Sequence, residues 1–262
     1  MIKVNLVMKA FVATAVVTTC AAGCTAGPES SSTTANVPMT GGGEPISFLA
    51  MDDHKVYGEL YSDHKPDTKK CVLMFHQARS NAGEYETIAP KVKALGFDCI
   101  AIDQRSGGEM WGRHNQTADK SGSGDYVAAY NDTVGAMKYA QGRSYTTIVI
   151  WGSSYSAALA LRLASENKDV SAVLVFSPGE YMDDQATVGR WAAGVNQPVF
   201  FACTPDEWSD GREKLFGQIV STHKVSLSLA GGVHGSSTLI PEKSKVADQY
   251  MAKAIEFLKG IK

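Results

Sequence analysis

The chain has 262 residues, of which 44% are hydrophobic, and its formal net charge is −2. This length and apolar content suffice for one sizeable α/β domain or for two small ones. The near balance of acidic and basic residues excludes the basic stripe of a nucleic-acid-binding protein, so we expect no nucleic-acid partner.

The first 23 residues carry the three regions of a secretory signal peptide. Met1–Lys9 contains two lysines and no acid, Ala10–Val17 is apolar, and the following residues up to Gly23 are small. The apolar run is too short to span a bilayer as a helix. Residues 1–23 are therefore predicted to be a signal peptide that is removed on export.

Cleavage after Gly23 would make Cys24 the new N-terminus. The stretch Ala21-Ala22-Gly23-Cys24 resembles a bacterial lipobox, in which this cysteine is lipidated. Several acyl chains anchor a protein stably, whereas one does not. We expect an exported cell-envelope lipoprotein held to a membrane through Cys24; the alternative is a secreted or periplasmic protein without lipid.

Residues 24–44 are rich in Ser, Thr, Gly and Pro and almost free of large apolar residues. Such a segment buries too little surface to offset its chain entropy, which predicts a flexible tether. The folded domain is expected over residues 45–262.

The predicted domain opens with a hairpin of two short strands and then alternates strands with helices. The hairpin is expected over 46–50 and 55–61, later strands over 71–76, 97–103, 147–151, 170–176, 199–203 and 225–229, and helices over 85–95, 126–140, 154–164 and 246–258. Near-continuous apolar strands that alternate with amphipathic helices predict an α/β fold: a mostly parallel twisted sheet with helices on both faces, after an N-terminal antiparallel hairpin. No insertion is long enough for a large cap domain.

A nucleophile elbow is predicted where the strand at 147–151 meets the helix at 154–164. Gly152-Ser153-Ser154-Tyr155-Ser156 fits the pattern Gly-x-Ser-x-Gly, except that Ser156 replaces the last glycine. Small residues flank the central serine because larger ones would collide across so sharp a turn. Ser154 is thus the candidate nucleophile; the alternative is a serine that only caps the helix.

A serine nucleophile needs a base, and the base needs a carboxylate to orient it. His234 lies in a glycine-rich loop after the last predicted strand, whereas His223 precedes that strand and is expected at the opposite edge of the sheet. Asp206 and Glu207 both follow the strand at 199–203, and either can reach an imidazole there. In parallel sheets ligands bind at the carboxyl ends of the strands, which is where these residues lie.

The order serine, acid, histidine resembles the α/β-hydrolase superfamily. Four stretches are similar to its small, capless dienelactone-hydrolase-like members: Phe75–Ser80 (FHQARS), Ala101–Gly108 (AIDQRSGG), Trp151–Ser156 (WGSSYS) and His234-Gly235. The spacing usual in this family favours Glu207 over Asp206 as the acid. The resemblance also implies an oxyanion hole made by the main-chain N–H of Tyr155 and by that of either Gln77 or Ala78.

Several residues near predicted strand ends are candidates for binding substrate. Trp111, Tyr181 and Trp208 are expected to wall an acyl pocket, with simple packing as the alternative, and Arg105 is a candidate partner for a substrate carboxylate, with a structural role as the alternative. No Cys or His spacing indicates a metal, and no cofactor is expected. Cys71, Cys99 and Cys203 lie in apolar runs and are predicted to be buried free thiols.

Together these motifs predict an exported serine hydrolase that cleaves a small-molecule ester or thioester through an acyl-enzyme, as carboxylesterases do. Two alternatives remain. One is a peptidase or acyltransferase that uses the same triad, and the other is a non-catalytic binding lipoprotein on a hydrolase scaffold.

Overall fold

The computed structural model describes residues 42–182, 184 and 186–262. The predicted signal peptide, Cys24 and nearly all of the predicted tether lie outside these residues. The first strand begins at Glu44, which pairs with Leu60, so the predicted tether extends one residue too far. Within the described part of the chain, no helix is both long and apolar enough to cross a membrane.

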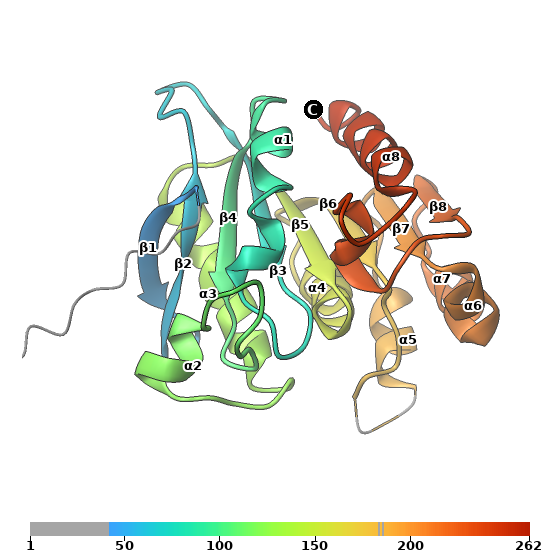
Figure 1. Cartoon of the computed structure of the whole chain (residues 1–262), viewed down its shortest axis with the longest axis horizontal. Helices are drawn as coiled ribbons and strands as arrows, with labels where there is room; N and C mark the ends of the chain where they lie inside the picture. Colours follow the sequence, from blue (N-terminus) through green and yellow to red (C-terminus); the bar gives the residue numbers. More distant parts are fainter. Residues whose placement is uncertain (1–41, 183, 185) are drawn as a thin grey trace, which may run out of the picture. The chain divides into compact units, whose positions relative to one another are not determined.

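Eight strands form one twisted sheet in the order β1-β2-β4-β3-β5-β6-β7-β8 (Figure 1). β1 pairs with β2, and β2 with β4, in antiparallel fashion, whereas all later pairs are parallel. The predicted antiparallel hairpin followed by a mostly parallel sheet is confirmed. The strands are β1 (Glu44–Leu49), β2 (Lys55–Tyr61), β3 (Lys70–Phe75), β4 (Asp98–Asp103), β5 (Thr147–Ser153), β6 (Val170–Phe176), β7 (Val199–Cys203) and β8 (Lys224–Ser228).

Helices cover both faces of this sheet, as the alternating pattern predicts. One face packs against α3 (Ala129–Gly142), α4 (Tyr155–Glu166), α5 (Thr187–Ala192) and α7 (Glu213–Gln218), and the other against α1 (Ala89–Lys93) and α8 (Ala247–Lys259). The shorter elements are α2 (Gln116–Ser121), α6 (Pro205–Glu207), the 3-10 turns η1 (Ala82–Tyr85) and η3 (Gly235–Leu239), and the irregular turn η2 (Trp208–Arg212).

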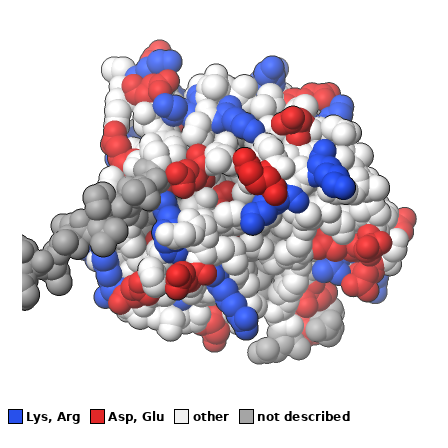
Figure 2. Space-filling view, viewed as in Figure 1, with Lys and Arg blue, Asp and Glu red and all other residues white. Residues whose placement is uncertain are grey.

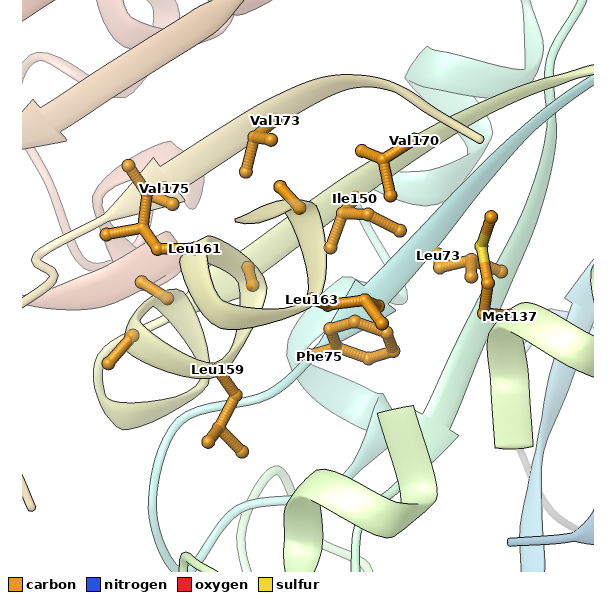
Figure 3. Close-up of a cluster of buried hydrophobic side chains, with 14 of the residues drawn as sticks. Leu73, Phe75, Met137, Ile150, Leu159, Leu161, Leu163, Val170, Val173 and Val175 are labelled. Atoms are coloured by element: carbon orange, nitrogen blue, oxygen red, sulfur yellow. The ribbon is translucent and has the colours of Figure 1, made fainter. Parts of the chain in front are cut away.

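Alternation along the strands divides the core into two layers. Leu73 and Phe75 face the layer that contains α3 and α4, whereas Val72 and Met74 face the layer with α1 and α8. Figure 3 shows the first layer, in which leucines of α4 pack over Ile150 and neighbouring strand residues. Because central strands are apolar on both sides, polar groups concentrate at the strand ends.

Two predicted helices differ from the observed ones. The helix expected over 85–95 is a 3-10 turn at Ala82–Tyr85 and a separate short helix, α1, that begins at Ala89. Pro90 causes this break, because proline lacks an N–H and is tolerated in a helix only in its first turn. Likewise, α3 begins at Ala129 and leaves Tyr126 outside it, stacked on Tyr155 with ring centroids 4.3 Å apart.

On the face seen in Figure 2, acidic and basic side chains are intermixed and neither sign dominates a large area. Cys71, Cys99 and Cys203 are buried and free, as predicted.

Candidate active site

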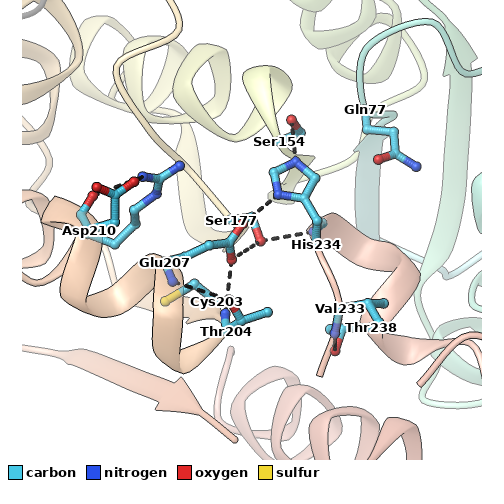
Figure 4. Close-up of polar contacts among 12 residues, drawn as sticks. Gln77, Ser154, Ser177, Cys203, Thr204, Glu207, Asp210, Val233, His234 and Thr238 are labelled. Carbon is cyan, nitrogen blue, oxygen red and sulfur yellow. Dashed lines mark hydrogen bonds and ion pairs between the residues drawn. The ribbon is translucent and has the colours of Figure 1, made fainter. Parts of the chain in front are cut away.

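Four loops at the carboxyl ends of neighbouring parallel strands bring the candidate residues together (Figure 4). Ser154 follows β5, Ser177 follows β6, Glu207 lies in α6 just after β7, and His234 lies in the loop after β8. This edge of the sheet is the position expected for a site in a parallel α/β fold.

Ser154 occupies a sharp strand-to-helix turn. Its backbone has φ 59° and ψ −126°, a strained combination for a residue with a Cβ, and its N–H donates to the main-chain oxygen of Phe176 at 2.8 Å. Gly152 makes this turn possible, since a Cβ there would lie 2.4 Å from the oxygen of Ser156 and 2.6 Å from Cα of Ala157. The turn therefore has the geometry of a nucleophile elbow.

Ser156, which replaces the usual glycine, is accommodated by hydrogen bonds. Its Oγ donates to the main-chain oxygen of His76 at 2.6 Å and lies 2.9 Å from Oε1 of Gln104. The hydroxyl thus joins the start of α4 to the loop after β3. The departure from the motif adds a tie between two loops of the site.

His234 connects Ser154 to Glu207. Its Nε2 lies 2.7 Å from Ser154 Oγ, and its Nδ1 lies 2.5 Å from Glu207 Oε1. An ionised carboxylate only accepts hydrogen bonds, so Nδ1 must carry the ring proton and Nε2 is left to accept from the serine hydroxyl. This is the protonation pattern that activates a serine.

Three hydrogen bonds fix the Glu207 carboxylate. Besides His234, it accepts from Ser177 Oγ at 2.7 Å and from the main-chain N–H of Thr204 at 2.9 Å. Burial alone would raise the pKa of Glu207, but these bonds outweigh it and lower the pKa to about 2. Asp206 is exposed and has no hydrogen-bond partner within the described chain, so the geometry selects Glu207.

The oxyanion-hole candidates are reduced to two. The N–H of Gln77 donates to Glu84 Oε2 at 2.8 Å, so the prediction of Gln77 as a free donor was wrong. Among the described residues, no acceptor faces the N–H of Ala78 or that of Tyr155, which follows Ser154. These two N–H groups remain available for a developing oxyanion.

His76 is a fully buried structural residue. Its Nδ1 donates to the main-chain oxygen of Gln77 at 2.7 Å, and its Nε2 accepts from the N–H of Gln104 at 2.9 Å. Burial lowers the pKa of His76 to about 4, so the ring stays neutral.

Two further polar residues of this site have no role assigned from the sequence. Glu84 is fully buried in η1 and holds Gln77 as described, and Ser177 bridges Glu207 to the N–H of Gly235 at 2.9 Å. No local motif marks Glu84. The position of Ser177 directly after β6 was the one signal available for it.

The three aromatic residues predicted to wall an acyl pocket, Trp111, Tyr181 and Trp208, lie in different surroundings. The Tyr181 hydroxyl donates to the main-chain oxygen of Ser177 at 2.8 Å and lies 3.4 Å from the Arg212 guanidinium. Burial raises the pKa of Tyr181, and the nearby Arg212 only partly offsets this effect. Trp208 is partly buried and packs against Phe201 and Phe216 at the margin of the core, which is the packing alternative to a pocket wall.

Of the other two aromatic candidates, Trp111 packs against the core and Tyr181 lines a cavity. The indole N–H of Trp111 donates to Ser80 Oγ at 2.8 Å, and its ring packs against the core layer that contains α1 and α8. Tyr181 borders a cavity of about 370 Å³, whose walls include Gly179, Glu180, Arg212 and Leu215. This cavity lies between the loop after β6 and the segment formed by η2 and α7.

Arg105 is not available to substrate, so that prediction was wrong. Its guanidinium forms ion pairs of 2.7 Å with both Asp52 and Asp132, and the Asp132 side chain is fully buried. The N–H of Arg105 also donates to Asp132. The residue anchors the loop after β4 to α3. Within the described residues, no cluster of His, Cys, Asp and Glu has the composition of a metal site.

Comparison with known proteins finds one matching family and many solved structures with a similar fold. The model of the family described as "Serine aminopeptidase, S33" matches residues 66–234, more than half of the chain. No curated protein matches the sequence.

Three solved structures illustrate the shared fold. An esterase of Pyrococcus furiosus is 17% identical with a TM-score of 0.62, over 84% of this chain and 91% of its own. A thermostable carboxyl esterase of Bacillus coagulans is 13% identical with a TM-score of 0.66, over 83% and 98%. A dienelactone hydrolase of Anabaena variabilis is 14% identical with a TM-score of 0.65, over 84% and 98%. At such identities the likeness shows the fold alone, which is the fold expected from the sequence.

We expect Arg105→Gln to lower the free energy of unfolding by about 3 to 5 kcal/mol, because it leaves Asp132 buried without its cation. Urea unfolding measures this loss, with Arg79→Gln as the matched control: Arg79 is exposed, and its replacement should change stability by less than about 0.5 kcal/mol. A rise in KM with unchanged stability for Arg105→Gln would instead assign this arginine to substrate.

Proposed function

The chain belongs to the serine aminopeptidase S33 family, and from this membership and the site geometry we propose that it is a serine esterase acting on a small-molecule ester or thioester. Family and α/β-hydrolase fold make the protein a hydrolase. The observation that carries the finer proposal is the continuous hydrogen-bonded chain from Ser154 through His234 to Glu207. Two free N–H groups accompany it.

In the proposed reaction, Ser154 Oγ attacks the carbonyl carbon while its proton passes to His234 Nε2. The ionised Glu207 stabilises the resulting imidazolium, and the N–H groups of Tyr155 and Ala78 stabilise the oxyanion. The bond to the leaving oxygen or sulfur breaks as the imidazolium returns the proton to it. Water, deprotonated by the same nitrogen, then attacks the acyl-enzyme and releases the acid.

A second candidate activity comes from the family's description, which names an aminopeptidase. Such an enzyme binds the free α-amino group of its substrate, for which a nearby carboxylate is suited. Glu180, beside Tyr181, already accepts the N–H groups of Val188 and Gly189 at 2.8 Å each. Because both oxygens of the Glu180 carboxylate bond to α5, the esterase is favoured. Assays with aminoacyl p-nitroanilides and with p-nitrophenyl esters separate the two activities.

We also propose, from the sequence alone, that the hydrolase is exported and anchored through a lipidated Cys24. Residues 1–23 have signal-peptide anatomy, and the stretch that ends at Cys24 resembles a lipobox. The domain would then act at a membrane surface, on substrates outside the cytoplasm.

A fluorophosphonate probe should label the purified protein, and Ser154→Ala should abolish both labelling and p-nitrophenyl ester hydrolysis. The reason is that only an activated serine hydroxyl reacts with such probes at an appreciable rate. Ser156→Ala is the control and should still be labelled. Equal labelling of the wild type and Ser154→Ala would refute the proposed nucleophile.

Glu207→Gln should lower kcat for ester hydrolysis by on the order of 10³- to 10⁴-fold. An amide N–H facing Nδ1 moves the ring proton of His234 to Nε2, which then cannot accept from Ser154. Asp206→Asn, one residue away, should stay within about twofold of the wild type, since surface changes outside a network have small effects. The opposite ranking of the two variants would make Asp206 the acid.

Intact mass spectrometry of the protein purified from membranes tests the anchor. We expect a mature chain that begins at Cys24 and carries added acyl mass, with the unlipidated Cys24→Ser variant released from the membrane fraction. A mature N-terminus at any other residue contradicts lipidation.

A further inference from the structure

Glu84 is a carboxyl group buried between the loops that form the candidate site. It lies in η1, and its side chain is fully buried. Its Oε2 accepts from the N–H of Gln77 at 2.8 Å, and its Oε1 accepts from Ser153 Oγ at 2.6 Å. Each partner directly precedes a residue of the proposed mechanism, because Gln77 comes before Ala78 and Ser153 before Ser154.

A third loop joins the same network. Ser153 Oγ also accepts from the N–H of Ser236 at 2.8 Å, two residues beyond His234. The packing is tight here, since a Cβ at Gly235 would lie 2.6 Å from Ser153 Oγ. One carboxyl group therefore connects the loop after β3, the elbow and the histidine loop.

The hydrogen bonds around Glu84 suit its ionised form. Two donors face its two oxygens, and a carboxylate accepts both. Ser153 has a single hydroxyl hydrogen, which it donates to Glu84 while its oxygen accepts from the N–H of Ser236. A proton on the Glu84 oxygen would leave that hydrogen without an acceptor.

We propose that the Glu84 carboxylate is a positioning residue for the oxyanion hole, which fixes the Gln77 peptide against Ser153 so that the N–H groups of Ala78 and Tyr155 converge on one point. The inference rests on the proposed function. It explains why a charged group lies here without touching Ser154 or His234. Misplacing a group of a site by about 1 Å can cost on the order of 10²-fold in rate.

This role makes the oxyanion hole dependent on pH. Burial raises the pKa of Glu84 to about 7, although the bonds from Ser153 and Gln77 and the nearby His234 act to lower it. The groups that bear on it are His234 from the loop after β8, Tyr85 of its own turn and the uncharged Ser80 hydroxyl. Glu84 is therefore neutral below about 7 and ionised above it, and the positioned form gains population as pH rises.

Full activity then requires His234 Nε2 to be unprotonated, so that it accepts from Ser154, and Glu84 to be ionised. On the acid side of the profile, log kcat/KM of the wild type against pH should approach a slope of two. Glu207 does not contribute to this slope, because its pKa of about 2 keeps it ionised over the acid side of the profile.

The test compares pH profiles of p-nitrophenyl ester hydrolysis for the purified wild type, Glu84→Gln and Asp103→Asn. In Glu84→Gln the amide either faces Gln77 with a second N–H or leaves the Ser153 hydrogen unpaired. We expect kcat to fall about 10²-fold, KM to stay unchanged and the slope to return to one.

Asp103→Asn is the matched control. Asp103 is also buried, which raises its pKa to about 6, and it accepts the N–H groups of Ala82 and Gln116 at 2.7 and 2.8 Å. It anchors the same turn as Glu84 but contacts neither Gln77 nor Ser153. Asp103→Asn should lose stability and keep the steep acid limb.

A wild-type slope of one overturns this inference, even where Glu84→Gln fails to fold. So does a folded Glu84→Gln variant with kcat within twofold of the wild type, or an equal loss of slope in Asp103→Asn. Fluorophosphonate labelling of Ser154 in each preparation separates the two proposals. Absent labelling of the wild type overturns the proposed function and this inference with it, whereas a labelled, active enzyme with slope one overturns this inference alone.

Discussion

The strained turn at Ser154 is the constraint on which the rest of the site depends. A residue with a Cβ at φ 59° persists only where its surroundings hold it, and here Gly152 lets α4 approach β5 to within van der Waals contact. Polar groups then hold the turn from each side. Ser156 ties it to the loop after β3, and Ser153 ties it to Glu84 and to the loop of His234.

Two carboxyl groups of this site have opposite pKa shifts, and their burial and the number of their donors explain why. Glu207 accepts three hydrogen bonds, including one from His234, which outweigh burial and lower its pKa to about 2. Glu84 is fully buried and accepts two from uncharged donors, so burial prevails and raises its pKa to about 7. The first is thus a permanent charge, suited to stabilising an imidazolium, and the second is a charge that depends on pH.

The fold could be predicted because apolar strands and amphipathic helices recur in regular alternation, and Ser154 and His234 because their local motifs fix their place. Adjacent carboxylates are harder, since Asp206 and Glu207 differ only in which way they turn. Yet Thr204 and Glu207 form a capping box, whose spacing in the sequence indicates that Glu207 turns back toward β7. Glu84 and Arg105 have no such sign, because their roles arise from partners distant in the chain.

Access of water bears on the choice between hydrolysis and acyl transfer. The His234 side chain is 44% exposed, whereas Ser154 is only 6% exposed. In the proposed mechanism an acyl group on Ser154 would therefore be buried, while His234, the proposed base, faces solvent. A transferase must exclude water at that stage. The exposed imidazole thus favours water as the acceptor of the acyl group, which supports a hydrolase over a transferase on this triad.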